Sequence, residues 1–147
     1  MTRSEQLVQL AGRDIELDCT DYQGLQRIMH ALYEQLLARN SAQIEVLNQQ
    51  ISVLLEFIGA RADRRSKILA AFGLSASASG AMERLLSHSP LPSRTGFLQQ
   101  WAELEQLVQQ TKQVNERNGK LLAMHNEILS QIIGSEHSSS VYSARYY

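Results

Sequence analysis

The chain has 147 residues, of which 44% are apolar, 20% charged and 6% aromatic, so it has room for one domain with a modest core. Lysine and arginine total 14 against 15 for aspartate and glutamate, and the net charge of -1 argues against a general polyanion binder. Cys19 has no second cysteine to pair with, and the N-terminal residues lack the apolar run of a signal peptide, so we expect a cytoplasmic protein. No stretch approaches the roughly 20 apolar residues of a membrane span, which predicts no membrane insertion.

The first predicted helix covers residues 20–38. Thr20 and Gln23 have the spacing of a capping box, which places the start of the helix at Thr20. Downstream of it, apolar side chains recur every three or four positions, as on one face of a helix. These are Tyr22, Leu25, Met29, Leu32 and Leu36.

The second predicted helix covers residues 41–72, because the apolar pattern restarts at Ile44 after a break. Asn40, with Gln43 three residues on, is typical of an N-cap. The short connection predicts that the first two helices are antiparallel neighbours. Residues 73–95 are rich in glycine and serine and contain both prolines, so we predict a linker that includes a short helix.

The third predicted helix covers residues 96–133, with Thr95 as its N-cap and Gly134 as its end. Residues 135–147 are rich in serine and are predicted to form a mobile tail. Three long amphipathic helices predict an all-α fold, an antiparallel bundle or coiled coil within a single domain of residues 1–134.

No catalytic or metal site is apparent in the sequence. An acidic segment precedes the first predicted helix and resembles a calcium loop, but Cys19 stands where that loop needs glycine and Leu25 where it needs a carboxylate. We therefore expect this segment, with Asp14, Glu16, Asp18 and Asp21, to be solvated. The four histidines lack the spacing of a zinc site, and the single cysteine lacks a catalytic motif. We predict no enzyme activity and no cofactor.

A nucleic-acid site is also not predicted. Four basic residues lie near the end of the second predicted helix: Arg61, Arg64, Arg65 and Lys67. Cations are favoured at helix C-termini, Asp63 interrupts the run, and no aromatic residues alternate with the cations to stack on bases. We therefore interpret the cluster as an ordinary helix end.

Asn115, Asn118 and Gly119 interrupt the apolar stripe in the middle of the third predicted helix. Glycine costs about 1 kcal/mol relative to alanine there, and asparagine is also a poor helix former. A structural explanation is that glycine lets another helix approach closely while the asparagines hydrogen-bond across the contact and set its register. A functional explanation is that the notch receives a helix of a partner protein.

The segment from Val114 to Leu122 resembles the N-x-x-N-G-x-L-L signature of the FlgN family of flagellar type III export chaperones. The break at Asn40 and the leucine pairs around it resemble that family's first helical hairpin, and Val141-Tyr142-Ser143 resembles its tail motif. The resemblance covers most of the chain from about residue 25 onward.

This resemblance implies a cytosolic, non-enzymatic chaperone. Its clients would be the hook-filament junction proteins FlgK and FlgL, held by their C-terminal helical segments, and Tyr142 would dock the loaded chaperone on the flagellar export gate. An amphipathic client helix can be masked by laying its apolar face in a groove between other helices. We predict client binding at Val114, Asn115, Asn118, Gly119, Leu121 and Leu122.

The alternative is a structural adaptor that forms homo-oligomers through the same apolar stripes. A homodimer is also compatible with the chaperone, because a second copy can cover a groove that holds no client.

Overall fold

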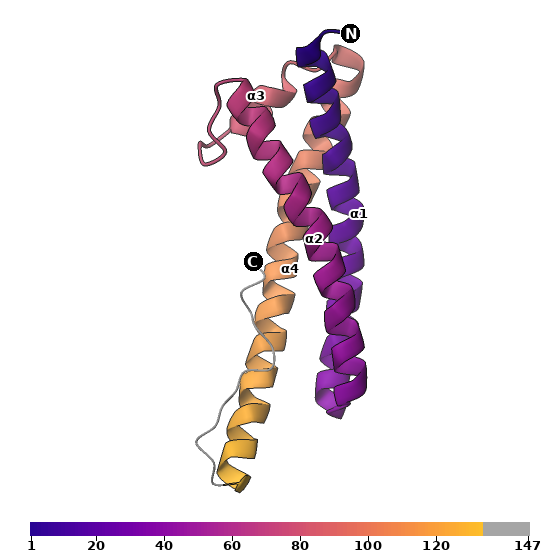
Figure 1. Ribbon diagram of the computed structural model, residues 1–147, viewed down its shortest axis with the longest axis vertical. Helices are drawn as coiled ribbons and strands as arrows, with labels where there is room; N and C mark the ends of the chain where they lie inside the picture. Colours follow the sequence, from indigo (N-terminus) through magenta and orange to yellow (C-terminus); the bar gives the residue numbers. More distant parts are fainter. Residues whose placement is uncertain (134–147) are drawn as a thin grey trace. The chain divides into compact units, whose positions relative to one another are not determined.

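The computed structural model describes residues 1–133, and the regular secondary structure of this part is helical throughout. It contains four helices, α1 (Arg3–Ala38), α2 (Ser41–Ala71), α3 (Ala81–Leu86) and α4 (Leu91–Ile133), in the order drawn in Figure 1. The predicted all-α class is confirmed for these residues. Gly134 and the predicted tail at 135–147 lie outside the described residues.

α1 begins at Arg3, and the predicted start at residue 20 is wrong. The capping box is at the N-terminus instead: the Thr2 amide donates to Glu5 Oε2 at 3.1 Å, and the Glu5 amide donates to Thr2 Oγ1 at 3.1 Å. Thr20 lies inside the helix, where its hydroxyl donates to the backbone carbonyl of Glu16. The helix is longer because its apolar stripe continues upstream through three buried residues, Val8, Ala11 and Ile15.

The connection between α1 and α2 is a tight turn at the predicted position. Arg39 adopts the left-handed conformation with φ 54°, and the Asn40 amide donates to the carbonyl of Gln35 at 3.0 Å, which closes the end of α1. The side chain of Asn40 then accepts a hydrogen bond from the Gln43 amide at 3.2 Å. The predicted N-cap of the second helix is thus confirmed, and Figure 1 shows the chain reversing there.

α2 ends at Ala71, close to the predicted residue 72. Gly73 has φ 72°, a conformation that suits glycine, and the Leu74 amide donates to the carbonyl of Leu69 at 2.9 Å. The short helix expected in the linker is α3, whose apolar residues are all buried: Ala81, Met82, Leu85 and Leu86.

α4 begins at Leu91, upstream of the predicted start at 96, and Thr95 lies inside it and does not cap it. The prolines that we expected to keep this segment out of a helix are compatible with its start. Pro92 lies in the first turn, where a backbone N–H has no acceptor within the helix, so its missing donor costs nothing.

The chain divides into two compact units, and α1, α2 and α4 each contribute a segment to both. The first unit comprises Met1–Gln23 and Glu56–Val108. Within it α2 runs antiparallel to α1, since Asp14 pairs with Arg64 and Asp21 with Arg61. Its core contains the following buried apolar residues: Val8, Ile15, Ile68, Leu69, Leu85, Leu86, Phe97 and Leu104.

The second unit comprises Gly24–Leu55 and, among the described residues, 109–133. Within it α1 and α2 form an antiparallel hairpin, while α4 runs in the same direction as α1, because Gln26 contacts Thr111 and Met29 contacts Asn118. The α1 segment supplies most of the core, with Leu25, Met29, Leu32 and Leu36 at most 1% exposed. In the α2 segment Ile51 is the one buried residue, and Val46 and Val53 are 45% and 52% exposed.

Candidate functional site

The signature segment of α4 lies in the second unit, and most of its residues face inward. Asn118, Asn115 and Leu121 are 0%, 3% and 7% exposed. Val114, Gly119 and Leu122 are half-buried. The structure therefore brings the predicted client-binding residues together on one segment, with its two asparagines in the interior.

Asn118 connects α4 to α1. Its side-chain Nδ2 donates to the backbone carbonyl of Met29 at 2.9 Å, and the asparagine is fully buried. This is the cross-helix contact that the structural explanation predicts for an asparagine in an apolar seam. Because a buried amide must be matched by a partner, the contact also specifies the register of α4 against α1 in this unit.

Three further contacts reinforce the same pairing. Gln26 donates from Nε2 to the hydroxyl of the buried Thr111 at 3.1 Å. The guanidinium of Arg117 lies 3.8 Å from the ring centre of Tyr33, a cation–π contact, and also contacts Nδ1 of His30 at 3.3 Å. These contacts hold the α4 segment that carries Leu122 against α1.

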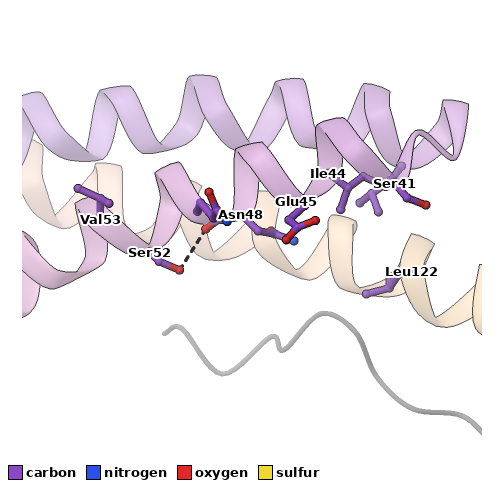
Figure 2. A pocket seen from close by; sticks show the side chains of 9 residues that line it. Ser41, Ile44, Glu45, Asn48, Ser52, Val53 and Leu122 are labelled. Carbon is purple, nitrogen blue, oxygen red and sulfur yellow. Dashed lines mark hydrogen bonds between the residues drawn. The ribbon is translucent and has the colours of Figure 1, made fainter.

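A groove opens in the second unit where Leu122 of α4 faces α2 (Figure 2). Its volume is about 730 Å³, within the range of about 300–1,000 Å³ of ligand pockets. Leu36 of α1 lies at its base, since that residue is buried. The remaining lining residues come from α2: Ser41, Ile44, Glu45, Asn48, Gln49, Ser52 and Val53.

The α2 wall of the groove is both apolar and polar. Ser41, Glu45, Asn48 and Ser52 follow the three- and four-residue spacing of a single helix face, flanked by Ile44 and Val53. The hydroxyl of Ser52 donates to the backbone carbonyl of Asn48 at 3.0 Å, drawn as the dashed line in Figure 2. The sequence pattern did not indicate this wall, because an apolar stripe does not show which of its residues face the core and which face a partner. Client binding was predicted on α4 alone.

Two of the four carboxylates that we expected to be solvated are instead buried in the first unit, while Glu16 is exposed and Asp21 half-buried. Asp14 and Asp18 are 1% exposed. Asp14 accepts two hydrogen bonds from Arg64, each of 2.7 Å, and Asp18 accepts one of 2.5 Å from Arg61. Arg65 also pairs with Asp18.

The three arginines of the basic cluster on α2 accordingly serve as ionic partners of α1, which corrects their interpretation as an ordinary helix end. The fourth member, Lys67, is exposed. Burial disfavours the charge of Arg61, but its hydrogen bonds to Asp18 and Asp21 outweigh that effect and raise its pKa above the usual value. A signal for this network was present in the sequence, since Asp14, Asp18 and Asp21 have helical spacing, as do the arginines.

Cys19 is buried in the first unit and has the properties of a structural cysteine. Desolvation raises the pKa of its thiol to about 11, and the negative charges of Glu103 and Asp18 add to the shift. Its Sγ lies 3.5 Å from the carbonyl oxygen of Gln100 on α4. At neutral pH the thiol is protonated and therefore a poor nucleophile.

The described residues contain no group of three or more histidine, cysteine, aspartate or glutamate side chains arranged to hold a metal ion. None of their helices is both long and apolar enough to cross a membrane. Tyr142, the predicted gate-docking residue, lies outside the described residues.

No curated protein and no solved structure matches the chain. The sequence model of the FlgN protein family matches residues 6–145. We expected the similarity to begin at about residue 25, but it begins well upstream and includes most of α1. The chain therefore belongs to the FlgN family of flagellar export chaperones.

Proposed function

We propose that the chain binds the C-terminal helical segments of the hook-filament junction proteins FlgK and FlgL in the groove of the second unit, and delivers them in the cytosol to the flagellar export gate. The observation that carries this proposal is the position of Leu122. This signature residue lines the same groove as Leu36 and Ile44, which belong to the hairpin that resembles the first hairpin of the family.

The groove suits an amphipathic helix. Its base and flanks are apolar at Leu36, Ile44, Val53 and Leu122, and an exposed surface of this kind is typical of a docking site. A helix laid between α2 and the Leu122 side of α4 would bury its own apolar face there, as in other helix-in-groove complexes. Masking that face would prevent a junction protein from assembling before export.

In this proposal the buried signature residues of α4 support client binding by positioning the helix, without contacting the client. Asn118 is bonded to α1, and Asn115 and Leu121 are buried beside it. By holding α4 in one register they keep Leu122 at the groove. Their substitution is therefore expected to weaken client binding together with stability, whereas Leu122 acts by direct contact.

A matched pair of valines on α2 tests the groove. Val53 lines it and is 52% exposed, whereas Val46 lies outside it and is 45% exposed. Val53→Asp should weaken binding of a FlgK C-terminal segment by about tenfold or more, since it places a charge in the apolar contact. Val46→Asp should change the affinity by less than about twofold. Isothermal titration with the full chain measures both affinities.

Circular dichroism should show the same helix content in both variants, because both valines are largely exposed. Equal effects of the two substitutions would contradict the groove assignment. The homo-oligomeric adaptor remains the alternative: it predicts self-association in light scattering, lost in either variant, and no complex with FlgK or FlgL.

Gate docking is proposed for Tyr142, on the resemblance of Val141-Tyr142-Ser143 to the family's tail motif. A buried aromatic anchor contributes about 2 kcal/mol or more to an interface, so Tyr142→Ala should reduce binding of the loaded chaperone to the cytosolic domain of the export gate. Client affinity should stay unchanged. Loss of client binding instead would contradict the separation of the two roles.

A further inference from the structure

The polar stripe on the groove wall carries a single charge. Glu45 is exposed and is the only ionised side chain among the 9 lining residues. The ion pairs formed by the described residues all involve other carboxylates. Within the α2 segment of this unit, residues 41–55, no lysine or arginine is present to compensate it. The lining of the groove therefore carries one negative charge and no positive one.

Asn48 adds an unused hydrogen-bonding group one turn away. Its side-chain Oδ1 is buried and accepts no hydrogen bond from the described residues. A buried acceptor without a donor is unfavourable, so a turn of this side chain toward a donor on a ligand would relieve that cost. Figure 2 shows Asn48 and Glu45 as neighbours along α2.

We infer that the groove selects amphipathic helices in which a lysine or arginine flanks the apolar stripe. This inference rests on the proposed binding of client helices in the groove. The apolar stripe would contact Leu36 and Leu122 while the flanking cation pairs with Glu45. An acidic residue at the same flank would be repelled by the like charge of Glu45, so the wall also disfavours helices with an acidic flank.

Three synthetic helical peptides test the inference directly. They share one apolar stripe and differ only at the flanking positions, which are lysine, glutamine or glutamate. Fluorescence anisotropy measures their affinities for the full-length chain at low and at physiological ionic strength. The lysine peptide should bind up to about fivefold more tightly than the glutamine peptide, as expected for an exposed ion pair, and the glutamate peptide more weakly. The differences should shrink as salt is added.

Variants of Glu45 assign the preference to this residue. Glu45→Gln should remove the difference between the three peptides, and Glu45→Lys should reverse their order. Glu34→Gln is the matched control, because Glu34 is also exposed and belongs to the same unit but does not line the groove. It should leave the order of affinities unchanged.

The outcomes separate this inference from the proposed function. Equal binding of the three peptides, or an order that Glu45→Lys does not change, overturns the charge preference and leaves groove binding intact. Failure of all three peptides to bind overturns the groove assignment and this inference with it.

Discussion

Two glycines within helices of the first unit have opposite surroundings. A Cβ atom added at Gly12 of α1 would lie 2.4 Å from Cζ of Phe97 on α4, whereas one added at Gly59 of α2 would meet nothing within 4 Å. Gly12 therefore permits the close packing of an aromatic ring on a helix backbone. Gly59 has no such role in the described structure, and its cost to the helix is uncompensated there.

The two glycines predict stability changes of opposite sign. Gly59→Ala should raise the free energy of unfolding by up to about 1 kcal/mol, the difference in helix propensity. Gly12→Ala gains the same propensity but forces Phe97 out of its place, which typically costs about 1–3 kcal/mol, so the net effect should be destabilising. Urea denaturation measures both. A stabilised Gly12→Ala variant would contradict the packing described for Phe97.

Cys19 predicts a slow thiol reaction. With a pKa of about 11, on the order of one thiol in a thousand is ionised at pH 8, so alkylation by iodoacetamide should be far slower than in urea-unfolded protein. The stability that comes from keeping the thiol neutral is complete below pH 9.0, the unperturbed pKa, and is lost as the pH rises to about 11. Equal labelling rates in folded and unfolded chain would contradict the burial of Cys19.

Among the elements, the ion-pair network between α1 and α2 is the clearest determinant of register in the first unit. Asp18 accepts hydrogen bonds from both Arg61 and Arg65, and Asp14 pairs with Arg64. A slip of one residue would separate each carboxylate from its guanidinium, and the Asp14 and Asp18 carboxylates are buried. A buried charge without a partner is strongly unfavourable, so the alternative registers are destabilised.

This network predicts a large effect of Asp18→Ala. The substitution leaves Arg65 without its ionic partner and Arg61 with Asp21 alone, so the free energy of unfolding should fall by about 3–5 kcal/mol. Asp63→Ala is the control, because Asp63 is exposed on the same α2 segment, and should change stability by less than about 0.5 kcal/mol. Similar losses in the two variants, measured by urea denaturation, would show that the pairs do not determine stability.

The elements also show what the sequence could predict. The break at Asn40 and the end of α2 were predictable, because local caps determine them. The N-terminal half of α1 was missed because Asp14 and Asp18 fall on its buried face and hide the apolar period. The start of α4 was missed because proline within the first turn was interpreted as a break. In the first case the arginines that pair with these carboxylates lie on another helix. In the second case the outcome depends on the exact position of proline within the turn.

The candidate site was predicted less completely than the fold. Leu122 was predicted as a contact residue and lines the groove, but the opposite wall on α2 was not predicted. Periodicity identifies the apolar face of a helix without showing whether another helix covers it. In the second unit the α1 face is covered, at Leu32 and Leu36, while the α2 face stays open around Val53.

At the scale of the whole molecule, the two units differ in how fully their segments are packed. In the first unit both α1 and α2 contribute buried residues, among them Ile15, Ile68 and Leu69, and charged side chains on both helices are paired. In the second unit α2 buries Ile51 alone. Weak local burial is typical of segments that bind ligands, because they are drawn from the less stable part of a structure.

Hydrogen–deuterium exchange of the full chain, with and without a FlgK C-terminal segment, tests the central claim that clients bind in the groove. Without the segment, amides in residues 41–53 of α2 should exchange faster than those in residues 24–36 of α1. Binding should slow exchange in 41–53 and around Leu122, and leave the first unit unchanged. Protection confined to the first unit, or the absence of any protection at the groove when the complex is saturated, would contradict the account.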